Sequence, residues 1–231
     1  MRLSRSVVIH TISESRSLVW PLLLTACSGL DEELTPSPTP TPSPYVQAVD
    51  SFEPGEAAGF GQDLFPTIVY GPPVGGGVSQ GSVDVLSLGL GGEIVLSFGI
   101  LRVVDGDGPD FVVFENPFYI TEGVSYAEPA QVSVSLDGER WTSFPCALSA
   151  YPYEGCAGVT PVTANLELGI SPLDPAQAGG DLFDLASIGV AEARYVRITD
   201  GGVVGVSSTA PAAGFDLDAV ALLHHRIAAA E

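Results

Sequence analysis

The sequence predicts one all-β domain, a sandwich or a barrel, and three observations support this prediction. From about Tyr45 onward, short runs of β-branched and aromatic residues alternate with Gly, Pro, Asp and Asn, which is typical of short strands joined by turns. No convincing amphipathic stretch longer than about ten residues favours a helix. The length of 231 residues, with 27 Gly and 19 Pro, suits one domain and a tail.

The N-terminal segment, residues 1–26, has the features of an export signal. Three Arg residues precede a short apolar core at residues 18–24, and this core is too short to span a bilayer. Residues 24–27, Leu-Thr-Ala-Cys, resemble the bacterial lipobox, which implies that Cys27 carries a lipid and anchors the chain to a membrane. Ser28 stands where inner-membrane retention signals have Asp, so the resemblance favours the outer membrane of the cell envelope. An ordinary signal peptide with a chance cysteine is the alternative.

Residues 27–46 are predicted to form a linker. Pro alternates with Thr or Ser over residues 35–44, which excludes helix and sheet and favours an extended polyproline II rod. At about 3.1 Å per residue, this rod spans about 30 Å. The folded domain, residues 47–231, is therefore expected to work at a surface, at a distance from its anchor.

Strands are predicted at residues 82–88, 93–98, 111–114, 130–136, 141–144 and 195–199. In the second of these, Ile94, Leu96 and Phe98 fall on one apolar face. Asp137-Gly138 is a strong hairpin signal between the fourth and the fifth. Trp141 is interpreted as a core residue, because Trp is usually well buried.

The last part of the domain combines one short helix with a closing strand. Residues 181–189 are predicted to be helical, with Asp181 as the N-cap and Gly189 as the C-terminal stop. Residues 214–220 read as a strand. Strand alternation places Asp216 and Asp218 on one face of it, which is unusual if that face is buried.

The most acidic part of the domain lies around one apolar strand. Asp105, Asp107 and Asp110 stand among Gly and Pro residues, directly before the strand at 111–114, and two further oxygen-bearing side chains follow it. Clustered carboxylates repel one another unless a cation or protons neutralise them. Oxygen ligands on a flexible glycine loop favour Ca²⁺ over Zn²⁺ or Mg²⁺, although the spacing is not that of an EF-hand.

We therefore expect a structural calcium site that also gathers carboxylates from the closing strand. A solvated acidic turn is the alternative interpretation. The candidate metal ligands are Asp105, Asp107, Asp110, Glu115, Asn116, Asp216 and Asp218.

Cys146 and Cys156 remain as an even pair once Cys27 is assigned to the lipid. In an exported protein they are expected to form a disulfide. Tyr151 and Tyr153 lie in the loop that this disulfide closes. They are candidate binding residues for a sugar ring, and the alternative is that they cover the disulfide.

Charge and composition argue against several function classes. The net charge of −20 disfavours nucleic acid and anionic lipid headgroups as partners. The chain has no Lys and only three His, and it lacks the common motifs of metalloproteases, phosphate loops and serine hydrolases. A non-enzymatic role is therefore predicted.

Several motifs occur together along residues 48–225. As a set they resemble a bacterial family of exported cell-surface proteins of unassigned function. The resemblance implies a single jelly-roll β-sandwich, similar to galactose-binding and discoidin-type domains, in which cations at the rim are often structural. It implies no catalytic residues, and Asp107 stands where the family pattern leads us to expect a neutral residue. The motifs lie at residues 59–62, 87–92, 105–116, 128–130, 132–138, 178–181, 193–200 and 214–220.

Three functional hypotheses follow. The first is a lipid-anchored, calcium-stabilised surface module that binds a glycan or a partner in the cell envelope. The second is a purely structural envelope or adhesion protein. The third is a polysaccharide hydrolase or lyase that uses carboxylates, for which Glu115 and Glu128 are the residues to change.

Overall fold

The computed structural model of the chain describes residues 42–122, 124–202 and 213–229. The predicted signal segment, the lipidation site Cys27 and most of the predicted linker lie outside these ranges. Among the described residues, no helix has the length and apolar character needed to cross a membrane.

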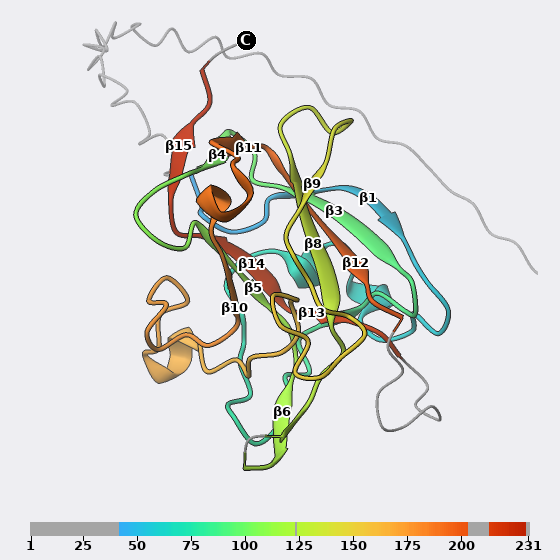
Figure 1. The fold of residues 1–231 in the computed structure, drawn as a ribbon. Coiled ribbons are helices and arrows are strands. Elements are labelled where there is room, and N and C mark those ends of the chain that lie inside the picture. The colour runs from blue at the N-terminus through green and yellow to red at the C-terminus, as the bar shows by residue number, and fades with distance from the viewer. Residues whose placement is uncertain (1–41, 123, 203–212, 230–231) are drawn as a thin grey trace, which may run out of the picture. The chain divides into compact units, whose positions relative to one another are not determined.

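The described fold is all-β, as predicted, with antiparallel sheets and four short 3-10 helices (Figure 1). The strands are β1 Ala48–Glu53, β2 Leu86–Ser87, β3 Glu93–Ser97, β4 Leu101–Val104, β5 Phe111–Phe114, β6 Phe118–Thr121, β7 Val124–Tyr126, β8 Ala130–Ser135, β9 Thr142–Ser143, β10 Asp181–Phe183, β11 Glu192–Ala193, β12 Tyr195–Asp200, β13 Asp216–Leu217, β14 Ala219–Leu222 and β15 His225–Ile227. The 3-10 helices are η1 Gln62–Leu64, η2 Thr67–Val69, η3 Leu166–Leu168 and η4 Leu185–Ile188.

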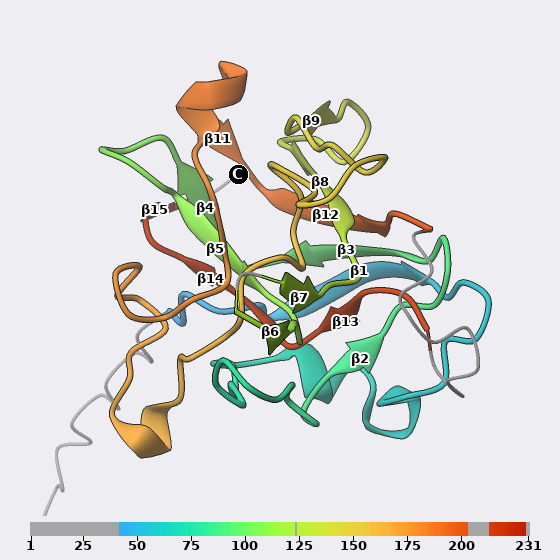
Figure 2. The ribbon, with the colours of Figure 1, turned by 60° about the horizontal axis from the view of Figure 1, so that its bottom comes forward.

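Two sheets form the body of the sandwich. The larger has the strand order β1-β3-β12-β8-β9, and the smaller has the order β10-β5-β14. Smaller sheets, β11-β4-β15, β13-β2 and the hairpin β6-β7, extend them. Figure 2 shows this hairpin beside β13.

The main hydrophobic core draws side chains from both sheets. In β12 the alternation predicted from sequence is present, with Val196 and Ile198 fully buried and Tyr195 and Arg197 only partly buried. The smaller sheet is covered on both faces, because Phe111 and Val113 of β5 join the main core while its other residues join a second apolar cluster. Burial on both faces explains why the sequence of β5 is continuously apolar.

The predicted helix at 181–189 is wrong in its first half. Residues Asp181–Phe183 form β10, which pairs with β5, so tertiary pairing overrides local propensity. The helical turn is η4, and its N-cap is Asp184, whose side chain accepts a hydrogen bond from the Ala186 N–H. Gly189 does end it, with a left-handed φ of 68°.

Two other expectations need correction. Trp141 is not in the core: it is partly exposed and its ring packs against the Arg197 guanidinium, at 4.3 Å from the ring centroid. The end of the predicted linker is part of the sandwich, because the Pro44 carbonyl accepts a hydrogen bond from Leu222 and Val46 is 3% exposed.

Candidate metal centre

The predicted calcium loop does not gather its three aspartates around a common point. Asp105 and Asp107 are exposed, whereas Asp110 is fully buried. The Asp110 carboxylate already has partners within the protein. Its Oδ1 accepts a hydrogen bond from the Gly106 N–H at 2.8 Å and lies 3.0 Å from His224 Nδ1, and its Oδ2 accepts one from the Leu185 N–H at 2.7 Å.

Asp110 is therefore a structural carboxylate that ties the loop, η4 and the end of β14 together. Asp105, Asp110 and Asp184 do have carboxylate oxygens within 4.8 Å of one another. However, Asp110 is occupied by its own donors and Asp184 Oδ1 caps η4. Among the described residues, none of the buried unpartnered side-chain atoms belongs to this group.

The opposite end of β5 carries a second acidic cluster, formed by Glu115, Glu128 and Asp216. One carboxylate oxygen from each lies within 4.8 Å of the others. Since β5 separates Asp110 from Glu115 and strands rise about 3.3 Å per residue, the two ends lie about 17 Å apart. The single site predicted from sequence is thus divided: Asp105 and Asp110 lie at one end of β5, and Glu115, Asn116 and Asp216 lie at the other.

Three separate segments of the chain bring these side chains together. Glu115 and Asn116 directly follow β5, Glu128 precedes β8, and Asp216 begins β13. The β6-β7 hairpin returns the chain from Glu115 to Glu128, and the Asp218 N–H donates to the Phe114 carbonyl at 3.0 Å. Residues distant in sequence therefore meet at the base of the hairpin.

The cluster contains oxygen atoms that no described residue satisfies. Glu115 is 3% exposed, and its Oε1 accepts a hydrogen bond from the Asp216 N–H at 3.2 Å, but its Oε2 has no hydrogen-bond partner among the described residues. Asp216 Oδ1 and Asn116 Oδ1 are likewise buried without a partner there. A buried polar atom without a partner is costly, so the two carboxylate oxygens, Glu115 Oε2 and Asp216 Oδ1, favour a ligand.

The negative charges of the cluster also need compensation. Burial, followed by the nearby charges of Asp216 and Glu128, raises the pKa of Glu115 well above its usual range. Burial and the Asp216 charge raise the pKa of Glu128 to about 7. The pKa of Asp216 is also raised, mainly by burial. Protons or a cation must therefore neutralise this cluster at neutral pH.

Two neighbouring aspartates are positioned differently. Asp200 is satisfied by backbone donors, since it accepts hydrogen bonds from Gly91, Gly202 and Phe215, and it holds the segment that leads into Asp216. Asp218 is outside the cluster: it is 3% exposed, and both of its oxygens lie 3.2 Å from the Val74 N–H.

The donor set of the cluster is oxygen only. Three carboxylates, without His or Cys, suit a hard cation. Ca²⁺ accepts six to eight oxygen ligands in flexible geometry, whereas Mg²⁺ usually keeps several of its waters. An enclosed set of carboxylates therefore fits Ca²⁺ better than Mg²⁺ or Zn²⁺.

Sequence reasoning missed Glu128 as a member of the acidic cluster and named it only as an acid to test for catalysis. The available signal was an acidic residue standing immediately before a buried strand, in Glu128-Pro129-Ala130. Nothing local indicates that this segment folds back onto Glu115.

The predicted disulfide between Cys146 and Cys156 is present, with the two Cα atoms 4.6 Å apart. The rings of Tyr151 and Tyr153 meet edge to face, with their centroids 5.7 Å apart. The Tyr151 hydroxyl accepts a hydrogen bond from the Ser125 N–H of β7 at 3.2 Å. Tyr151 therefore connects the disulfide loop to the hairpin, and Tyr153 packs against Tyr151.

Comparison with models of protein families gave no match, and a search of curated proteins gave no significant match. Function is therefore inferred from the geometry of the cluster and from the sequence.

Proposed function

We propose that the chain is a non-catalytic, lipid-anchored protein of the bacterial cell surface. Its β-sandwich is stabilised by Ca²⁺ and binds a glycan or a protein of the cell envelope. The observation that carries the proposal is the cluster of Glu115, Glu128 and Asp216, with its buried, unpartnered oxygens.

The proposed role of calcium is to join three segments at the base of the β6-β7 hairpin. The ion neutralises three carboxylates whose mutual repulsion otherwise opposes folding. A cation that binds only the native state stabilises that state by mass action. Calcium is thus proposed as a structural part of the domain.

The low exposure of the clustered carboxylates supports the non-catalytic part of this proposal. Glu115 is 3% exposed and Glu128 is 8% exposed, so a polymeric substrate has little access to either carboxylate. The surface location rests on the lipobox-like residues and the proline-rich linker. Binding of a glycan or envelope partner rests on analogy with similar folds and on the exposed Tyr151, which has 49% of its surface accessible.

A carboxylate hydrolase or lyase is the second candidate, because a pKa of about 7 at Glu128 suits a general acid or base at neutral pH. Two results together would favour this candidate: the wild-type chain turns over a polysaccharide in EDTA, and Glu128→Gln abolishes that turnover. A glycan array on which the calcium-loaded protein binds nothing would favour a purely structural envelope protein.

Calorimetric titration with Ca²⁺ tests the metal part of the proposal. We expect a saturable binding heat for the wild-type chain and an affinity lowered roughly tenfold or more by Glu115→Gln, since affinity follows the number of charged ligands. Asp107→Asn is the matched control, because it removes a sequence-predicted ligand that lies outside the cluster and should leave binding unchanged. Equal heats for Glu115→Gln and the wild type would contradict the proposal.

A further inference from the structure

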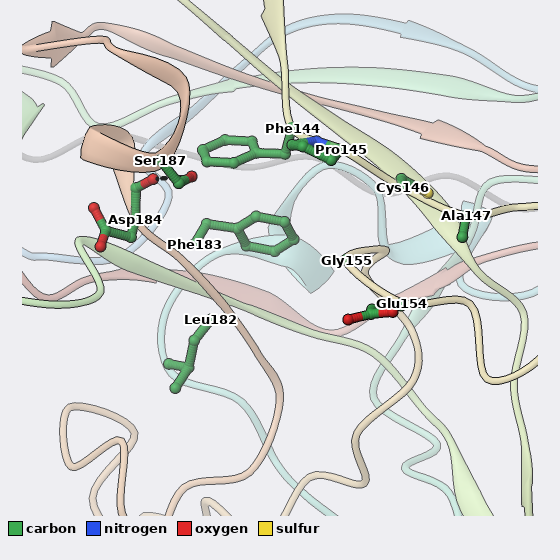
Figure 3. Close-up of a pocket in the computed structure, with 10 residues that line it drawn as sticks. All are labelled: Phe144, Pro145, Cys146, Ala147, Glu154, Gly155, Leu182, Phe183, Asp184 and Ser187. Atoms are coloured by element: carbon green, nitrogen blue, oxygen red, sulfur yellow. Dashed lines mark hydrogen bonds between the residues drawn. The ribbon is translucent and has the colours of Figure 1, made fainter.

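A second site-like feature lies away from the acidic cluster, where the disulfide loop faces β10 and η4. Figure 3 shows this pocket, which has a volume of 690 Å³. Pockets of about 300–1,000 Å³ are typical of small-molecule sites. Its ten lining residues include Phe144, Leu182, Phe183, Glu154 and Asp184.

Apolar side chains form the body of the pocket. The rings of Phe144 and Phe183 meet at 4.9 Å between centroids, and each also packs against Phe111 of β5. Both rings are 4% exposed, so they present an edge of the main core to the pocket. Leu182 is 43% exposed beside them, which adds an uncovered aliphatic wall.

The charged groups of the pocket are both acidic. Glu154 and Asp184 lie on opposite sides of the two phenylalanine rings in Figure 3. None of the ten lining residues is basic, and no salt bridge among the described residues includes either carboxylate. With a net charge of −20 on the chain, the field at this pocket favours cations and disfavours anions.

The wall of the pocket is fixed before any ligand arrives. The Cys146–Cys156 disulfide closes the loop, and the Ala147 N–H donates to the Glu154 carbonyl at 2.9 Å. Gly155 has a φ of +78°, and a Cβ at this position would stand 2.2 Å from the Pro145 carbonyl oxygen. Only glycine fits there, so the two limbs of the loop pack closely together.

We propose that this pocket binds a small organic cation with an aromatic or branched apolar body and one ammonium or guanidinium group. The apolar body fits against Phe144, Phe183 and Leu182, and the cationic group pairs with Asp184 or Glu154. An anion of the same shape meets two carboxylates and no basic lining residue. The inference goes beyond the proposed function, because the pocket shares no residue with the calcium cluster.

Tryptamine serves as the test probe, and indole-3-propionate is its control with a similar ring and opposite charge. In an NMR chemical-shift titration of the calcium-loaded chain, we expect tryptamine to shift the amides of residues 144, 146, 147 and 182–187. Indole-3-propionate should leave them unshifted.

Two double variants distinguish the effect of the pocket carboxylates on binding from the effect of the net charge of the chain. Asp184→Asn with Glu154→Gln should weaken tryptamine binding roughly threefold to tenfold, because the double variant removes whichever carboxylate pairs with the ammonium group and also the attraction of the other. Asp50→Asn with Asp63→Asn makes the same change in net charge at exposed positions outside the pocket and should have little effect. The Asp184→Asn change keeps a side-chain oxygen that can cap η4, so the local fold is retained.

The apolar wall has its own pair of variants. Leu182→Ser should weaken tryptamine binding, whereas Leu168→Ser, at a 73% exposed position outside the pocket, should not. Equal binding of tryptamine and indole-3-propionate would overturn the proposal. So would equal effects of the two double variants, or amide shifts confined to other parts of the domain.

Discussion

At the scale of single residues, hydrogen bonding rather than burial separates the roles of Asp110 and Glu115. Both carboxylates are enclosed, at 0% and 3% exposure. Asp110 receives two backbone N–H donors and contacts the His224 ring, whereas Glu115 has one oxygen without a described partner. The hydrogen bonds of the first carboxylate are therefore complete within the protein, and the second keeps one oxygen for the proposed calcium ion.

Asp110→Asn is expected to lower stability without affecting calcium. Asn offers one acceptor oxygen where the aspartate uses two, so a buried donor loses its partner at a cost of about 2 kcal/mol. Urea denaturation measures this loss, and calcium titration should match the wild type. Normal stability together with lost calcium binding would instead place the metal site in the Asp105–Asp110 loop.

Asp181 gives a prediction about pH. Its Oδ2 accepts hydrogen bonds from Gly158 and Val159, yet desolvation raises its pKa from 3.8 to about 6. The folded chain then holds a proton that the unfolded chain has lost, so this group's stabilising contribution falls as pH rises from 3.8 to about 6.

Urea unfolding of the wild type and Asp181→Asn across this range measures the effect. Because the variant lacks the titrating group, its stability relative to the wild type should rise with pH, by roughly 2 kcal/mol at most. A constant difference across this pH range would contradict the assignment.

At the scale of elements, strand patterns were predictable, whereas of the strand partners only the hairpin across Asp137-Gly138, in which β8 pairs with β9, was predicted. The apolar run of β5 indicated a buried strand because both of its faces are covered. Residues 181–183 were misread as helix because pairing with β5, which local sequence does not encode, fixes them as a strand.

The candidate site was predictable only in part, because its members come from segments whose pairing local sequence does not encode. The grouping of Glu115 with Asp216 followed from acidic residues beside strands. Asp218 was wrongly placed on the same face, because the chain leaves its pairing with β2 at Leu217 and pairs with β5 from Ala219. Strand alternation does not continue across that change of partner. Glu128 was missed because only the hairpin brings it to Glu115.

The β6-β7 hairpin should respond directly to calcium. Its two ends lead to Glu115 and Glu128, so an ion held by both carboxylates pins its base. Hydrogen exchange of the amides in Phe118–Thr121 and Val124–Tyr126 is expected to slow when calcium is added, since binding to the native state opposes local opening. Glu115→Gln should abolish this protection. If calcium slows exchange equally in the variant, the protection of the hairpin does not depend on Glu115, and the prediction is contradicted.

At the scale of the whole molecule, the acidic excess opposes folding. A net charge of −20 repels itself in the compact state, and salt screens this repulsion. In EDTA, the melting temperature should therefore rise gradually as NaCl is added.

Calcium is expected to act differently from this general screening. At fixed ionic strength it should raise the melting temperature to a plateau, and Glu115→Gln should lose that step while keeping the response to NaCl. Magnesium at the same concentration is the control for divalent charge. If calcium and magnesium raise the melting temperature equally in both chains, screening alone explains the effect.

The most direct test is anomalous diffraction from crystals of the chain grown with calcium. The proposed function predicts an anomalous peak within bonding distance of carboxylate oxygens of Glu115, Glu128 and Asp216. A peak beside Asp105 and Asp110 instead, or no peak among carboxylates in calcium-saturated crystals, would contradict it.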